Sequence, residues 1–85
     1  MKVVFTRAAE RSLLRLPTDR RRQILARIEA VAANPGNRRL HVEPLTGSDL
    51  FRLRVGIYRV LFSLNHARDV LTVELVRTRG DVYKR

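Results

Sequence analysis

Arginines alternate with apolar side chains over residues 51–59 (FRLRVGIYR). A period of two is typical of a half-buried strand, and Gly56 stands where a two-residue turn with glycine first joins two strands. In such a hairpin Arg54 pairs with Arg59, and Arg52 lies on the same face. Because like charges directly opposite one another destabilise a sheet, three arginines on one face indicate a site for an anion such as phosphate.

A solvated polar face with flat-lying side-chain stems explains Arg52 and Arg54 equally well. Arg59 favours the anion site, because it interrupts an otherwise apolar strand, Tyr58 to Phe62.

A second cationic cluster closes the sequence at residues 77–85 (RTRGDVYKR). Arginine can hold a phosphate while tyrosine stacks on a base, so the cluster has the chemistry of an RNA clamp. Composition alone favours a frayed basic tail instead. The candidate RNA-contacting side chains here are Arg77, Arg79, Tyr83, Lys84 and Arg85.

The charge balance points to a polyanionic partner. Eighteen Lys and Arg face eight Asp and Glu, which leaves a net charge of +10. Only Lys2 and Lys84 are lysines, so sixteen of the eighteen cations are arginines. A preference for arginine codons explains arginine over lysine but not the excess of cations over anions. The excess therefore predicts nucleic-acid binding.

No general base is evident beside these arginines. A general base must titrate near the working pH, and arginine is always protonated. The alternatives are Tyr83, His41 if its loop brings it near, or a mechanism of electrostatics and alignment alone. His66 falls in an expected turn, where a lone histidine is usually inert.

Length predicts one domain, residues 1–85. We expect no cofactor. The absence of cysteine excludes disulfides and cysteine-based zinc sites. No apolar run approaches the ~18 residues that span a bilayer. The first residues also lack the apolar stretch of a signal peptide, so we expect a cytoplasmic protein.

The elements that must position the arginines follow from periodicity. Residues 2–5 read as a strand, and Thr6 can cap a helix over 7–16. Pro17 suits the first turn of a second helix over 18–33. Strands are expected at 51–55, 58–64 and 70–76, with a turn between the last two. The prediction is an α+β fold with a helical hairpin packed on one face of an antiparallel β-meander. The expected apolar stripe of the second helix is Ile24, Ile28, Val31 and Ala32.

Residues 45–62 resemble the RelE/ParE toxin pattern, which is a Leu-x-Gly segment, an aromatic-Arg-Leu-Arg strand, a glycine turn and Tyr-Arg-Val. Arg79, Val82 and Tyr83 resemble the ending of that family. The N-terminal strand, the Leu-Pro break and the long second helix match in order. The resemblance covers nearly the whole chain and implies the RelE-like fold predicted above.

The resemblance implies a toxin of a type II toxin–antitoxin pair. RelE-like members are endoribonucleases that cut mRNA on the ribosome without a metal, by attack of a ribose 2′-OH on the adjacent phosphate. By this resemblance Arg59 grips the phosphate and Tyr83 stacks on the nucleotide. Arg79 assists the leaving oxygen, a role that an ungapped alignment assigns to Arg77 instead. Arg52 falls where many members carry a basic residue.

The chain departs from the family pattern at two positions. Leu50 stands where some members place lysine, and Thr78 stands where many short members place histidine.

Two other functions remain open. A ParE-like member poisons DNA gyrase, and a non-catalytic RNA-binding module needs only the charge. The family also implies an antitoxin, expected to be acidic and to wrap the toxin along its first two helices and its edge strand. Translation inhibition and plasmid stabilisation are the biological outcomes that the family implies.

Overall fold

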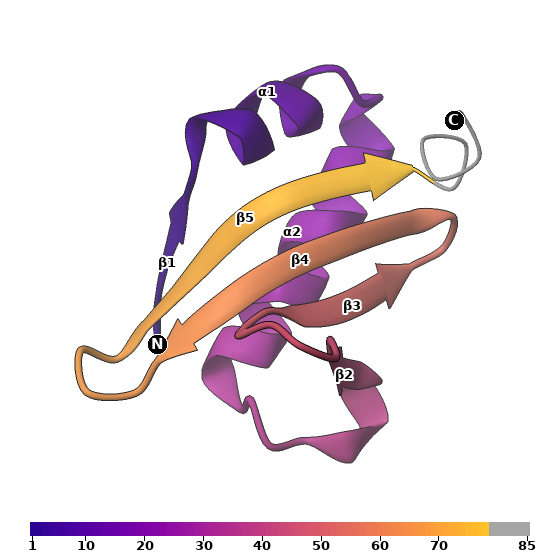
Figure 1. Ribbon diagram of the computed structural model, residues 1–85. Helices are drawn as coiled ribbons and strands as arrows, with labels where there is room; N and C mark the ends of the chain where they lie inside the picture. Colours follow the sequence, from indigo (N-terminus) through magenta and orange to yellow (C-terminus); the bar gives the residue numbers. More distant parts are fainter. Residues whose placement is uncertain (79–85) are drawn as a thin grey trace.

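The computed structural model describes residues 1–78 and shows two helices and a five-stranded sheet (Figure 1). The helices lie on one side of the sheet, with α2 running behind β4 and β5 in the view of Figure 1. Residues 79–85 lie outside the described residues, and with them the sequence-predicted residues Arg79, Tyr83, Lys84 and Arg85.

The helices begin where the sequence places their caps. Helix α1 spans Arg7–Leu14, and the Thr6 hydroxyl accepts a hydrogen bond from the Ala9 amide. It ends two residues before the expected boundary, and Pro17 is the N-cap of α2 rather than a residue of its first turn. Helix α2 spans Thr18–Ala33, as the periodicity predicts. None of the helices in the described part of the chain has the length and hydrophobicity of a bilayer-crossing segment.

The sheet has the order β1-β5-β4-β3-β2. The predicted meander is confirmed in the antiparallel pairs β3–β4 and β4–β5. The sheet is mixed rather than wholly antiparallel, because β1 pairs with β5 in parallel. The strands span Lys2–Phe5 (β1), Val42–Pro44 (β2), Phe51–Val55 (β3), Tyr58–Asn65 (β4) and Val70–Thr78 (β5).

Strand β2 was not expected from the sequence. It follows a short 3-10 helix, Arg38–Leu40 (η1), and pairs antiparallel with β3. Three residues that include a proline carry no readable alternation, so only the pairing with β3 defines this strand.

The β3–β4 turn has the predicted conformation. Gly56 has φ +60°, and Ile57 is not among the residues with positive φ. This combination fits a II′ turn, whose twist matches that of the strands. The turn fixes the register, so Arg54 stands opposite Arg59 as predicted.

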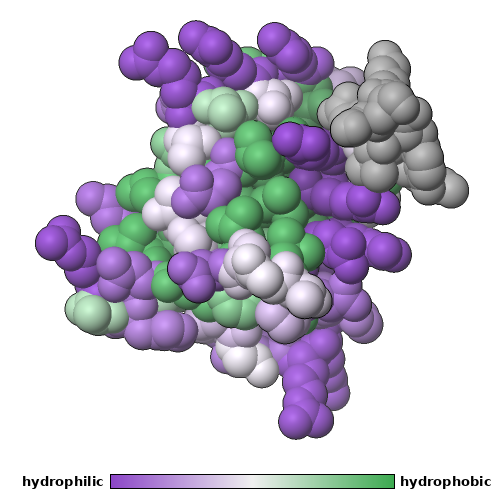
Figure 2. All heavy atoms as spheres, in the orientation of Figure 1, coloured by the Kyte–Doolittle hydropathy of each residue, from purple (hydrophilic) through white to green (hydrophobic). Residues whose placement is uncertain are grey.

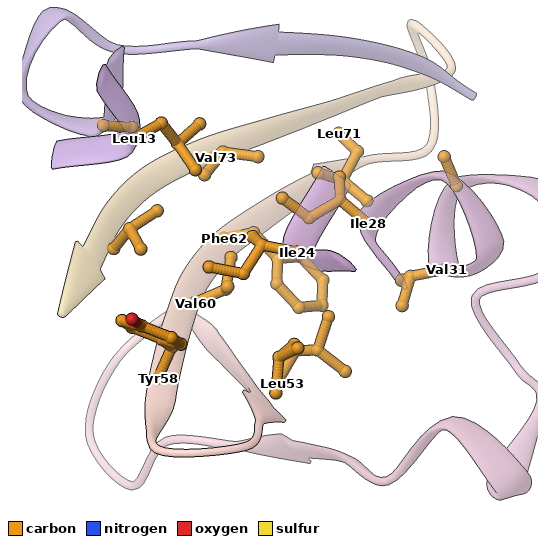
Figure 3. Packing of buried hydrophobic residues seen from close by; sticks show 14 residues of the cluster. Leu13, Ile24, Ile28, Val31, Leu53, Tyr58, Val60, Phe62, Leu71 and Val73 are labelled. Atoms are coloured by element: carbon orange, nitrogen blue, oxygen red, sulfur yellow. The ribbon is translucent and has the colours of Figure 1, made fainter. Parts of the chain in front are cut away.

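The hydrophobic core lies between the helices and the sheet (Figure 3). The four predicted stripe residues of α2 are all buried against inward-facing residues of β3, β4 and β5. Phe62 extends the core toward the start of β3 by stacking on Phe51, with ring centroids 5.6 Å apart. Since these side chains occupy one face of the sheet, alternation leaves the opposite face, called here the free face, to the residues between them.

Truncation of Ile24, which is 0% exposed, should destabilise the fold strongly. We expect Ile24→Ala to lower the free energy of unfolding by about 2–5 kcal/mol, because the surroundings cannot fully close the cavity. Leu14→Ala is the matched control, since Leu14 is a helical aliphatic residue that is 73% exposed. Its effect should stay within about 0.5 kcal/mol. Urea unfolding followed by circular dichroism measures both; equal losses would contradict the core assignment.

Candidate nucleic-acid interface

Three arginines form a row across the free face. Arg54 on β3 stands opposite Arg59 on β4, which in turn stands opposite Arg77 on β5. Neighbouring strands lie about 4.8 Å apart, so the three side chains leave the sheet close together. Arg54 and Arg77 are exposed and Arg59 is partly exposed. We call Arg54, Arg59 and Arg77 the arginine row.

The arginine row forms no ion pair among residues 1–78, although the carboxylate of Glu43 lies near Arg54. No carboxylate in this part of the chain lies within ion-pair distance of the three side chains. Figure 2 shows hydrophilic side chains gathered toward the end of this face where β3 and β5 terminate, with an apolar area over its middle. The row is therefore a concentration of positive charge suited to phosphate.

Arg77 joins the row because β5 changes its alternation. Leu71 and Val73 face the core, as regular alternation requires. The next buried residue of β5 is Val76 and not Leu75. The register shifts at this point, with Phe62 opposite Val73 and Leu61 opposite Leu75. The extra residue places Arg77 on the free face.

Arg52 lies on the same face but is held differently. Opposite it on β2 is Glu43, and its guanidinium donates a hydrogen bond to the Glu43 Oε1 at 2.5 Å. Its side chain is 27% exposed, and its Nε is buried without a hydrogen-bond partner within residues 1–78. Arg52 is thus partly neutralised and fixed in place, unlike the members of the arginine row.

A hollow of about 390 Å³ continues the arginine row to the sheet edge. Its walls are Arg27, His41, Glu43 and Arg54. Arg27 reaches from α2 to donate to the Leu40 carbonyl at 3.3 Å, which ties the helix to the loop before β2. His41 follows with φ +57° and ψ +48°, an uncommon conformation for a residue other than glycine. This loop brings His41 beside Arg54.

The carboxyl of Glu43 is charged at neutral pH. The hydrogen bond from Arg52 and its positive charge hold the pKa of Glu43 below 4.5, and the charges of Arg54 and His41 act in the same direction. The hollow therefore combines an anionic oxygen acceptor and an imidazole with two guanidinium groups.

The structure unites some predicted site residues and separates others. Arg52, Arg54, Arg59 and Arg77 share the free face. His66 lies in the β4–β5 turn, away from the row. Sequence reasoning missed Glu43, because it assigned no strand between residue 33 and residue 51, and missed Arg27, because its contact with the loop before β2 is tertiary. Only the β2–β3 register reveals that Glu43 and Arg52 form an opposite-charge cross-strand pair.

The sequence matches a family model described as the ParE toxin of type II toxin–antitoxin systems, parDE, over residues 3–83. The chain belongs to this toxin family. It is a type II toxin of the RelE/ParE superfamily, in agreement with the resemblance of its second half. No curated protein sequence matches the toxin significantly.

Solved structures of related toxins share the fold. The toxin is similar to the archaeal RelE–RelB complex from Pyrococcus horikoshii, with 29% identity, a TM-score of 0.79, and coverage of 93% of this chain and 94% of that chain. The RelBE2 complex from Mycobacterium tuberculosis also gives 29% identity, with a TM-score of 0.66 and coverage of 92% and 96%. A YoeB/ParE toxin from Agrobacterium tumefaciens shares the fold at 20% identity and a TM-score of 0.78, with coverage of 92% and 98%.

Removing one charge from the arginine row should stabilise the free toxin. We expect Arg54→Thr to raise the free energy of unfolding by about 0.2–1 kcal/mol at low salt, because it relieves like-charge repulsion across β3 and β4. Thermal unfolding with and without added phosphate measures this, and phosphate should stabilise the native protein more than the variant. In the control, Arg68→Thr, an exposed turn arginine is replaced. A loss of stability in Arg54→Thr alone would contradict the repulsion.

The ion pair of Glu43 should make stability depend on acid pH. A carboxyl whose pKa is lowered by folding stabilises the fold above its unfolded pKa, near 4.5, and this contribution disappears as pH falls through the lower folded value. Glu43→Gln should therefore destabilise the toxin at pH 7 and lose this effect in strong acid. In an NMR titration, Arg52→Gln should raise the pKa of Glu43 toward 4.5; an unchanged pKa would exclude Arg52 as its cause.

Proposed function

We propose that the toxin is an endoribonuclease that cleaves mRNA on the ribosome. The observation that carries the proposal is the arginine row, in which three arginines stand opposite one another on adjacent strands and form no ion pair in the described chain. Such an arrangement costs stability in the free protein and is useful only when an anion is bound. A phosphodiester backbone crossing β3, β4 and β5 supplies that anion.

The arginine row suits RNA cleavage in which a ribose 2′-OH of the strand itself is the nucleophile. The ribose 2′-OH loses its proton and its oxygen attacks the adjacent phosphorus. The bond to the 5′ oxygen then breaks, which leaves a 2′,3′-cyclic phosphate and a 5′-OH after that oxygen takes up a proton. Negative charge grows on the phosphate oxygens, and prepositioned guanidinium groups stabilise it. In this scheme Arg59, at the centre of the row, grips the scissile phosphate.

Arg77 or Arg79 assists the leaving oxygen, and Tyr83 stacks on the nucleotide, as the resemblance implies. Arg54, Lys84 and Arg85 add contacts to neighbouring phosphates, while Arg52 is held by Glu43 at the margin of the row. Arg77 has support from its place opposite Arg59.

The hollow beside Arg54 offers two candidate proton acceptors, one of which, His41, the sequence had already raised as an alternative. Its two titratable side chains other than arginine are His41 and Glu43. A carboxylate or a neutral imidazole can accept the 2′-OH proton within hydrogen-bond reach. Glu43 is ionised and therefore ready to accept, whereas its ion pair with Arg52 weakens it as a base.

We further propose an acidic antitoxin as the partner of this toxin in the cytoplasm. The related structures from P. horikoshii and M. tuberculosis are complexes with antitoxins. On the present chain, an apolar hollow of about 320 Å³ opens on the helical side, and Leu14 stands 73% exposed at its wall. A segment that combines apolar and acidic residues matches this hollow and the net charge of +10.

The family model favours a second candidate, inhibition of DNA gyrase. The matching model is that of the ParE toxins, and by the resemblance ParE toxins act on gyrase. In that case the arginine row is a binding surface and not a catalytic one.

A cell-free translation reaction with primer extension of mRNA 5′ ends tests the nuclease. The toxin should create new 5′ ends only where ribosomes translate. Arg59→Ala combined with Tyr83→Ala should reduce cleavage by at least about 100-fold, the cost of losing groups that stabilise transition-state charge. His41→Asn and Glu43→Gln, made separately, identify the proton acceptor.

Arg68→Ala is the matched control, because it removes an arginine from the β4–β5 turn outside the site. It should cut like the native toxin. Intact mRNA and continued translation with native toxin would reject the nuclease, and loss of gyrase supercoiling activity in a parallel assay would then support the second candidate.

A further inference from the structure

Thr6 contacts β5 at the point where the strand changes its alternation. Its backbone N–H donates to the Val73 carbonyl at 3.0 Å, and its hydroxyl donates to the Glu74 carbonyl at 2.7 Å. The same hydroxyl accepts from the Ala9 amide at 3.1 Å and so caps α1. One residue, through its backbone N–H and its hydroxyl, therefore joins the start of α1 to two successive carbonyls of β5.

Those two carbonyls mark the bulge. Phe62 pairs with Val73 and Leu61 with Leu75, so Glu74 is the residue without a counterpart on β4. Strand β1 ends at Phe5, opposite Val73, so no further residue of β1 pairs with β5 beyond this point. The Thr6 hydroxyl donates its hydrogen bond to the carbonyl of this unpaired residue.

The bulge decides which way Arg77 points. In an unbroken strand, Val73, Leu75 and Arg77 would share the core face. The extra residue instead buries Val76, which is 5% exposed, and turns Arg77 outward opposite Arg59. A loss of the bulge would exchange a buried valine for a buried arginine or break the end of the strand.

We propose that Thr6 is a positioning residue that holds the Glu74 bulge and thereby places Arg77 in the arginine row. The effect of Thr6 on RNA binding rests on the proposed function. Its effect on the conformation of β5 does not. The side chain of Glu74 gives a second attachment, because it accepts a hydrogen bond from the Ser63 hydroxyl at 3.2 Å.

Substitutions at Thr6 separate the two hydrogen bonds. Serine keeps both, since it can donate to Glu74 and accept from Ala9. Aspartate accepts at the cap as well as threonine does, but its carboxylate cannot donate to a carbonyl. Thr6→Asp therefore keeps the cap of α1 and removes the contact that holds the bulge.

Two measurements on the full chain test the role. The first is the affinity for a short fluorescein-labelled single-stranded RNA, in the native and Arg77→Ala backgrounds. Thr6→Ser should bind like the native toxin, and Thr6→Asp about tenfold more weakly, the effect of losing one charge-assisted hydrogen bond. In the Arg77→Ala background, Thr6→Asp should cause little further loss of RNA affinity, because the arginine that Thr6 positions is absent. A loss caused only by the added negative charge would persist there.

The second measurement is amide hydrogen exchange of residues 75–77 without RNA. Exchange should be slow in the native toxin and in Thr6→Ser, and faster in Thr6→Asp. Ser63→Ala, which leaves the cap of α1 untouched, should speed the exchange of residues 75–77 by a smaller amount. This variant replaces Thr6→Asp in the test if Thr6→Asp does not fold.

The outcomes separate the two proposals. Faster exchange in a toxin that does not bind RNA supports the role of Thr6 and rejects the RNA site. Unchanged exchange, or an RNA-binding loss of equal size in both backgrounds, overturns the role of Thr6.

Discussion

The pairing of β3, β4 and β5 places three arginines of like charge opposite one another on adjacent strands. The register of the three strands fixes the place of each arginine of the row, so repulsion between the side chains does not separate their backbone positions. The energy for this comes from the opposite face, where the same strands bury Leu53, Val60 and Phe62 against α2. The same strand pairing therefore holds both the hydrophobic core and the charged face.

A single bulge joins the helical layer to the charged face. The regular alternation of a strand ties every residue to one side of the sheet, and one extra residue reverses that assignment from there on. In β5 the reversal falls where β1 stops and α1 begins, which is where Thr6 meets Val73 and Glu74. The geometry of the arginine row therefore depends on a residue of the N-terminal segment.

The fold of this toxin is shared by relatives that carry the names RelE, YoeB and ParE. A common fold does not fix a target, because activity depends on the side chains placed on it. In this chain those side chains are the arginine row and the hollow with His41 and Glu43. In the proposed function, the row binds phosphate and the hollow accepts a proton, which is the combination that RNA cleavage requires.

The sequence by itself determined the local features: the limits of α2, the cap at Thr6, the Gly56 turn and the pairing of Arg54 with Arg59. Each depends on periodicity or on a few neighbouring residues. The tertiary structure alone decided the parallel pairing of β1, the existence of β2, the Glu43–Arg52 pair and the side on which Arg77 emerges. These depend on contacts between distant segments, and a three-residue strand or a single extra residue leaves no periodic signal in the sequence.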